Sequence, residues 1–194
     1  MIIIGLTGGI GSGKTFVGKF IMNLDFPFFN SDKEAKKIMI ENKEVIEQIK
    51  QVFGEKAYQD GSLNREYLAE QIFHNSELKK KMNAIVHPAV HKAFDEFCKI
   101  HSDKKAVFNE AAILFETGRY KDFDYNILVV APEETRIERV MKRDNTTKEE
   151  VLSRINNQWD DNKKADLADY IIINDGERAI KPQIEDIFSE LGIL

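Results

Sequence analysis

Short runs of apolar, β-branched and aromatic residues alternate along the chain with longer stretches in which apolar residues recur every three or four positions. The short runs occupy residues 2–4, 26–29, 106–109, 125–130 and 170–173. Continuous apolar runs of this length are typical of strands buried on both faces of a parallel sheet, whereas the periodic stretches indicate amphipathic helices. The pattern therefore predicts an α/β fold with a five-stranded parallel sheet and helices on both faces.

Two long helical stretches interrupt these runs. In the first, the periodicity predicts helices over residues 33–53 with a break near Asn42, over 63–73 and 78–86, and from Pro88 to about Ile100. No strand pattern appears between Asp32 and Lys104. In the second, it predicts helices over residues 133–143 and from Thr147 to about Leu167. We expect residues 32–104 and 132–167 to form two helical insertions in a core of residues 1–31, 105–131 and 168–194.

A glycine-rich stretch joins the first apolar run to the first helical pattern. Within residues 5–15, GLTGGIGSGKT, the spacing of Gly8, Gly13, Lys14 and Thr15 matches G-x-x-x-x-G-K-[ST], the P-loop. Such a loop turns its backbone N–H groups toward phosphate oxygens, and the following helix adds its positive end. Lys14 would then reach the β- and γ-phosphates, and Thr15 would offer a hydroxyl to Mg²⁺. The predicted nucleotide site comprises Gly9, Ile10, Gly11, Ser12, Gly13, Lys14, Thr15 and Phe16.

Composition narrows the class of protein. The 194 residues carry a formal net charge of −5, which disfavours broad binding to nucleic acid or to an anionic membrane. No apolar run approaches the roughly 18 residues of a membrane span, and no signal peptide is apparent. Cys98 is the single cysteine, so neither a disulfide framework nor a cysteine metal cluster is predicted. We expect a protein of the reducing cytoplasm.

A P-loop indicates a nucleotide phosphate but not a reaction, so three classes compete. A guanine-specific GTPase would show D-x-x-G and N-K-x-D, and neither pattern occurs. A motor ATPase would show an apolar run that ends in consecutive acidic residues, which residues 107–110 (VFNE) match poorly. A kinase needs a module for a second substrate and a lid that excludes water. The two helical insertions meet both needs and favour a kinase. We therefore expect residues 32–104 to be a helical acceptor module and residues 132–167 a lid, with the remaining residues as the nucleotide-binding core.

Three arginines in the second insertion are candidates for phosphate contacts. Arg136, Arg139 and Arg143 recur at spacings of three and four, which places them on one helix face. One interpretation is a solvated charged face. The other is a lid whose arginines close over the transferring phosphates.

Residues 5–14 resemble the P-loop of the dephospho-CoA kinase family, and the resemblance continues along nearly the whole chain. Further segments that resemble the family's motifs are 31–32 (SD), 63–65 (LNR), 87–88 (HP), 113–116 (ILFE), 139–144 (RVMKRD), 154–158 (RINNQ), 168–170 (ADY) and 174–176 (NDG). The chain departs from the family pattern at three positions. Asn30 replaces the first Asp of D-A-D, Ala112 replaces a proline, and Arg136 stands where a glutamine is common.

The resemblance implies transfer of the ATP γ-phosphate to the ribose 3′-hydroxyl of dephospho-CoA, with Mg²⁺. It places the general base at Asp32, which from the residues alone could equally cap the following helix. It also implies lid contacts from Arg139 and Arg143. Asn174 and Gly176 would belong to the adenine pocket, although a plain turn is the alternative there.

The resemblance places acceptor contacts at Arg65, His87 and Glu116. Read without the family, Arg65 is equally consistent with a surface residue, and His87 with the start of a helix before Pro88. His87 and His91 are four residues apart but lack the further ligands of a zinc site. Two alternatives remain for the whole protein: another small-molecule or nucleoside monophosphate kinase, and a non-catalytic ATP-dependent regulator. The oligomeric state stays open.

Overall fold

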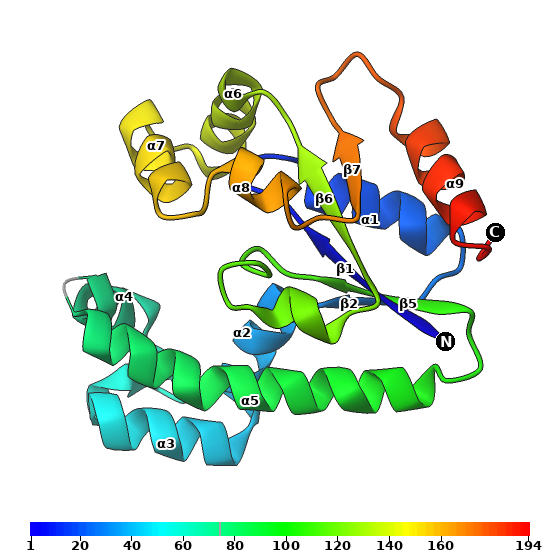
Figure 1. Cartoon of the computed structure of the whole chain (residues 1–194). Helices are drawn as coiled ribbons and strands as arrows, with labels where there is room; N and C mark the ends of the chain where they lie inside the picture. The colour runs from blue at the N-terminus through cyan, green and yellow to red at the C-terminus, as the bar shows by residue number, and fades with distance from the viewer. Residues whose placement is uncertain (74) are drawn as a thin grey trace. The chain divides into compact units, whose positions relative to one another are not determined.

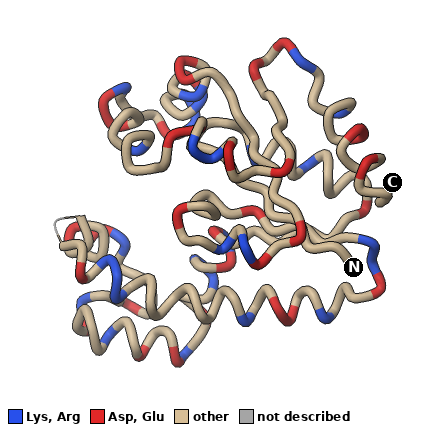
Figure 2. Tube along the Cα trace, in the orientation of Figure 1, with Lys and Arg blue, Asp and Glu red and all other residues tan. Residues whose placement is uncertain are grey.

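The computed structural model describes residues 1–73 and 75–194 (Figure 1). These residues divide into two compact units, one of residues 1–30 and 101–194 and the other of residues 31–100. We call them the sheet unit and the helical unit. Acidic and basic residues are interspersed along the described parts of both units (Figure 2). No helix in these described ranges is long and apolar enough to cross a membrane.

The sheet unit is built on five parallel strands in the order β2–β5–β1–β6–β7, which confirms the predicted fold class. The strands are β1 (Ile2–Thr7), β2 (Phe28–Asn30), β5 (Ala106–Glu110), β6 (Tyr125–Val130) and β7 (Tyr170–Ile173). All five residues of β5 are buried, as expected for a strand with neighbours on both sides and packing on both faces. Because the strands are parallel, the segments that follow them gather at one edge of the sheet.

Helices and a loop segment cover the two faces of this sheet. The helices of the sheet unit are α1 (Lys14–Asn23), α6 (Glu133–Asp144), α7 (Lys148–Asn156), α8 (Asp161–Ala165) and α9 (Ile180–Glu190), with a short 3₁₀ helix at Arg119–Asp122. Of these, α1, α8 and α9 contact strands of the sheet. On one face Ile4 and Leu6 form a single apolar core with Ile21 of α1 and Phe188 of α9. On the other, Gly5 lies against Leu114 of the segment after β5, and α8 contacts β6.

The helix predicted from Thr147 to about Leu167 is two helices. Thr147 Oγ1 accepts the Glu150 N–H at 3.3 Å, so α7 begins as expected, but it ends at Asn156. The Asp160 carboxylate accepts the Asn162 N–H at 2.8 Å and starts α8. An aspartate at this position satisfies an N–H at a helix start, and this second cap explains why the helical pattern does not continue unbroken.

The helical unit contains α2 (Ser31–Glu41), α3 (Lys43–Phe53), α4 (Arg65–Phe73) and α5 (Ser76–Ile100), with a short 3₁₀ helix at Glu55–Ala57. The predicted break at Asn42 is confirmed. Its side-chain oxygen accepts the Val45 N–H at 3.2 Å and caps α3. Asn64 likewise accepts the Tyr67 N–H at 3.1 Å at the start of α4.

Two expectations for this unit are wrong. Pro88 does not interrupt a helix, because α5 runs through it from Ser76 to Ile100. An interior proline costs a helix about 3 kcal/mol, and α5 offsets this by burying Met82, Val86, Val90 and Phe94 and by contacting α2, α3 and α4. A short antiparallel pair, β3 (Tyr58–Gln59) and β4 (Ser62–Leu63), also lies where no strand was predicted. Strands of two residues are too short to show a periodic pattern.

Candidate active site

The loop between β1 and α1 has the backbone that its glycines suggest. Gly11 and Gly13 have φ angles of 80° and 97°, a left-handed conformation that favours glycine. A Cβ atom on Gly13 would lie 2.0 Å from Asn174 Nδ2, so this position also requires glycine for space. The ammonium group of Lys14 donates to Gly8 O at 2.7 Å and to Gly9 O at 3.3 Å. The predicted P-loop is therefore curled, with its lysine lying along it.

A buried carboxylate stands beside the first turn of α1. Glu110 ends β5, and the strand register pairs it with Leu6 of β1 on one side and with Asn30 of β2 on the other. Only 4% of Glu110 is exposed. Thr15 Oγ1 lies 3.3 Å from its Oε1, and Asn30 Nδ2 lies 2.7 Å from its Oε2. A hydroxyl and a carboxylate together are oxygen ligands of the kind that Mg²⁺ prefers.

Sequence reasoning missed Glu110. Residues 107–110 were compared only with the consecutive acidic residues of motor ATPases and were judged a poor match. One signal could have identified it, since an apolar run that ends in a single carboxylate, parallel to the strand before the P-loop, places that carboxylate at the ligand-binding edge.

Two neighbouring cavities open beside the P-loop. The first, which we call the α9 cavity, has a volume of about 660 Å³ and the second, the α6 cavity, about 300 Å³. The α9 cavity is lined by Gly13, Phe16, Phe20, Arg139, Asn174, Gly176, Arg178, Ala179, Ile180 and Lys181. The α6 cavity is lined by Gly11, Gly13, Lys14, Thr15, Arg139, Val140 and Arg143. Four sequence-predicted cationic or hydroxyl residues, Lys14, Thr15, Arg139 and Arg143, thus meet around one cavity.

Asn174 connects the end of β7 to this loop. Its side-chain amide donates to Ser12 O at 2.8 Å, and Arg139 Nη1 donates to Asn174 O at 3.1 Å. Asn174 is buried. The interpretation of residues 174–176 as a plain turn is therefore incomplete, because Asn174 holds the P-loop and an arginine of α6 in one network.

Arg143 is held differently from Arg139. Its guanidinium makes two hydrogen bonds to Asp144, Nε to Oδ1 at 2.7 Å and Nη2 to Oδ2 at 2.9 Å. Arg154 of α7 donates to the same carboxylate at 2.8 Å. These contacts, chiefly the hydrogen bonds from Arg143, lower the pKa of Asp144 to about 2. The side chain of Arg143 nevertheless stays 62% exposed and lines the α6 cavity.

The remaining predicted residues lie elsewhere in the fold. Glu116 Oε1 accepts the Trp159 N–H at 3.1 Å and lies 3.3 Å from Nζ of Lys164, whose side chain is fully buried. Glu116 lines neither of the two cavities. Asp32 is the second residue of α2, Arg65 begins α4, and His87 immediately precedes Pro88 in α5, so these three belong to the helical unit.

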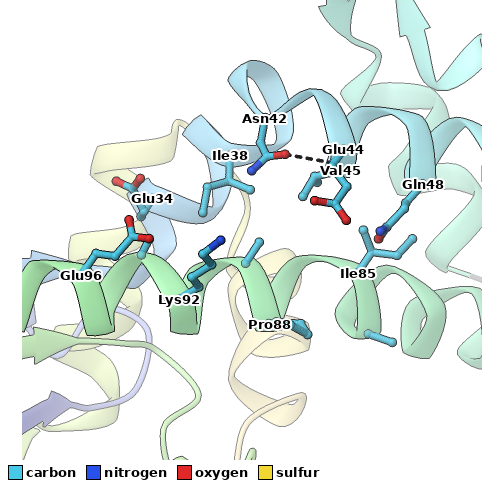
Figure 3. A pocket seen from close by; sticks show the side chains of 13 residues that line it. Glu34, Ile38, Asn42, Glu44, Val45, Gln48, Ile85, Pro88, Lys92 and Glu96 are labelled. Carbon is cyan, nitrogen blue, oxygen red and sulfur yellow. Dashed lines mark hydrogen bonds between the residues drawn. The ribbon is translucent and has the colours of Figure 1, made fainter.

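The helical unit has a pocket of its own, of about 580 Å³, between α5 and the corner where α2 meets α3 (Figure 3). Ile38, Val45 and Ile85 contribute apolar surface. The charged residues around it are Glu34, Glu44, Glu96 and Lys92, an excess of carboxylates that disfavours a polyanionic ligand. None of Asp32, Arg65 and His87 lines it.

Comparison with known protein families and curated relatives shows the family of this chain. The family model described as CoaE, dephospho-CoA kinase, matches residues 2–179. A dephospho-CoA kinase from Bacteroides fragilis is 35% identical over 190 residues, covering 98% of this chain and 93% of the relative. One from Salinibacter ruber is 41% identical over 179 residues, covering 91% of this chain and 90% of the relative.

A solved structure extends this likeness to the fold. The dephospho-CoA kinase from Campylobacter jejuni superimposes with a TM-score of 0.71 at 28% identity, covering 97% of this chain and 96% of that one. The match therefore spans both the sheet unit, with its curled P-loop, and the helical unit. On these grounds the chain belongs to the dephospho-CoA kinase family.

Proposed function

We propose that this protein transfers the γ-phosphate of ATP to the ribose 3′-hydroxyl of dephospho-CoA, giving coenzyme A and ADP. One observation carries the proposal beyond family membership, namely the convergence of Lys14, Thr15, Arg139 and Arg143 around the α6 cavity. Phosphoryl transfer needs positioning and positive charge around the transferring group more than it needs covalent chemistry. This cavity offers both.

We assign the two cavities to two parts of ATP. The α6 cavity, next to the P-loop and its lysine, would hold the triphosphate. The α9 cavity would hold the adenosine, because its volume suits a nucleoside and its walls combine the rings of Phe16 and Phe20 with the polar side chain of Asn174. The rings of Phe16 and Phe20 meet edge to face at a centroid distance of 5.1 Å. Phe16 is half exposed, so its ring has surface available for stacking with a base.

Thr15 and Glu110 would hold Mg²⁺ together with ATP. No group of three or more His, Cys, Asp or Glu side chains in residues 1–73 and 75–194 is arranged to bind a metal by itself. Phosphate and water oxygens would therefore complete the coordination, as is usual for this ion. When bound, Mg²⁺ would neutralise negative charge on the phosphates. The protein fixes the Glu110 carboxylate through the hydrogen bonds that this carboxylate accepts from Thr15 and Asn30.

Asp32 is our candidate for the general base that orients the acceptor hydroxyl and takes its proton. Among the residues that we assign to the acceptor, Arg65 would meet phosphates of dephospho-CoA, and His87 would support the site from α5. Glu116 would act indirectly, through other residues. Its contacts with Trp159 and Lys164 support a role in holding the segment between α7 and β7 beside the acceptor, rather than direct contact.

An acceptor screen tests this function. The full-length protein is incubated with ATP, Mg²⁺ and one acceptor at a time, namely dephospho-CoA, AMP, shikimate or gluconate, and ADP release and product mass are measured. We expect rapid phosphorylation of dephospho-CoA alone. The matched control is Lys14→Ala, which should fold yet lose most transfer because it removes a charge from the phosphates and not from the core. Equal turnover with AMP would contradict the proposed acceptor, and slow ATP hydrolysis that no acceptor stimulates would indicate a regulator.

A further inference from the structure

Both polar groups of the Ile10 backbone are bound from outside the P-loop. Its N–H donates to Gln158 Oε1 at 2.8 Å, and its carbonyl oxygen accepts a hydrogen bond from Arg136 Nε at 2.9 Å. Gln158 follows α7, and Arg136 lies in the first turn of α6. The tip of the loop is therefore fixed by two side chains that are distant from it in sequence.

The charge of Arg136 is balanced where it is buried. Only 6% of Arg136 is exposed, and its Nη1 lies 2.8 Å from Oδ2 of Asp161, the first residue of α8. A buried cation without a partner destabilises a fold strongly. Arg136 thus depends on Asp161, and through this ion pair α6, α8 and the P-loop are held together.

The position of Arg136 explains why two positions of the loop require glycine. A Cβ atom on Gly9 would lie 2.3 Å from Arg136 Nη2, and one on Gly11 would lie 2.5 Å from the Arg136 carbonyl oxygen. Neither approach leaves room for a side chain. Gly9 and Gly11 therefore let α6 pack onto the loop, in addition to the conformational freedom that Gly11 supplies.

We infer that Arg136, Gln158 and Asp161 are positioning residues that hold the P-loop in its phosphate-binding shape before a nucleotide arrives. We call these three residues the clasp. Ordering a backbone costs about 1–2 kcal/mol per residue, and a site ordered in advance leaves less of that cost to binding. The clasp binds both polar groups of the Ile10 backbone and so fixes the orientation of the peptide groups next to it. The N–H groups of these neighbours are then available to the phosphates, while the clasp itself takes no part in the chemistry. The inference rests on the proposed ATP site.

ATP affinity of full-length variants tests the clasp. Gln158→Met keeps the length of the side chain, removes the acceptor for the Ile10 N–H and changes no charge. From the loss of this one hydrogen bond we expect an affinity for MgATP that is about five- to tenfold weaker. Calorimetry measures this affinity. Affinity for dephospho-CoA should stay the same, and kcat at saturating ATP should fall less than kcat/KM for ATP. In the free protein, peptides that cover residues 5–15 should exchange their amide hydrogens faster.

The matched control is Lys148→Met. It breaks an exposed ion pair of 3.3 Å with Glu134, on the same pair of helices but away from the loop. This variant should bind MgATP as the wild type does. Affinity lost equally in both variants would contradict the clasp, because the loss would then come from the helices in general.

A double-mutant cycle tests the ion pair within the clasp. We expect Arg136→Met and Asp161→Asn each to weaken MgATP binding, and the double variant to bind no more weakly than Arg136→Met, since neighbours that act as a unit are not additive. If Arg136→Met does not fold, the MgATP affinities of Gln158→Met and Asp161→Asn still test the inference. A lower Tm with unchanged MgATP affinity and unchanged exchange would overturn the inference. If the wild type itself does not bind ATP, the proposed function fails instead.

Discussion

The side-chain amide of Asn30 donates a hydrogen bond to Glu110 Oε2 over 2.7 Å. The register between β2 and β5 sets these two residues side by side at the ends of their strands. An amide can donate to a carboxylate, whereas an ionised Asp at the same position could only accept. Asn30, a departure from the family's first Asp, therefore holds the Glu110 carboxylate by donation and adds no charge.

Asn30→Asp should bring two carboxylates within hydrogen-bonding distance. Their repulsion destabilises the folded protein where both are ionised. We expect a Tm below that of the wild type at pH 7.5, with the difference narrowing at pH 5 and on addition of Mg²⁺. Asn30→Ala is the control, since it removes the donor without adding charge and should show neither dependence. A Tm of Asn30→Asp that responds to neither pH nor Mg²⁺ would contradict this account.

Asp32→Asn separates the two interpretations of Asp32. It lies in the first turn of α2, where a negative charge contributes only about 0.3–1 kcal/mol to the helix. Asn keeps the size but cannot take a proton, and a positioned general base contributes on the order of 10²–10⁴-fold to the rate. We expect a folded protein that binds both substrates and loses turnover in that range. Turnover above about a third of the wild type's, with chemistry shown to limit the rate, would remove Asp32 from the reaction.

Replacing Arg139 and replacing Arg143 should have different effects. Arg139 already donates to Asn174 O and lines both cavities, so Arg139→Ala should weaken ATP binding as well as slow turnover. Arg143 is exposed and bound to Asp144, so Arg143→Ala should lower kcat more than it raises the Kd for ATP, if it engages the phosphate mainly in the transition state. Steady-state kinetics together with calorimetry measure both effects. An unchanged kcat in Arg143→Ala would assign this arginine to ground-state binding.

Asp144→Asn should show a stability difference that depends on pH. The hydrogen bonds from Arg143 lower the pKa of Asp144 from 3.8 to about 2. A carboxyl group whose pKa is depressed by folding stabilises the fold above its unfolded value and loses that effect as pH falls toward its folded value. The Tm difference between wild type and variant should therefore be constant from pH 7 to about 5 and shrink between about 4 and 2. A difference that stays constant down to pH 2 would show that the charge contributes nothing.

The parts of the fold that local chemistry determines were predictable. Five apolar runs became five strands, and the glycine spacing of residues 8–15 located the P-loop, because burial on both sheet faces and tight backbone curvature each restrict residue type directly. The helix break near Asn42, predicted from the periodicity, also has a local cause, since the short side chain of Asn42 accepts the Val45 N–H.

Features that depend on distant partners were not predictable. Pro88 lies inside α5 because packing against three other helices outweighs its local cost, and sequence periodicity does not report packing. The Glu110 carboxylate is identified as a site residue by its hydrogen bonds with Thr15 and Asn30, which lie 95 and 80 positions away in the chain. Arg136 looked like one of three equivalent arginines on a helix face. Its burial against Ile10 and Asp161 becomes visible only in three dimensions.

The order of strands in the sheet has a consequence for biosynthesis. β2 lies next to β5, yet all of residues 31–100 are translated between them. Closing a long disordered loop costs conformational entropy before any strand contact repays it. We therefore expect the helices of residues 31–100 to become compact while the nascent chain is still growing, with β2 left unpaired until Glu110 has left the ribosome. Nascent chains released before that point would contain a complete P-loop sequence and still fail to bind ATP.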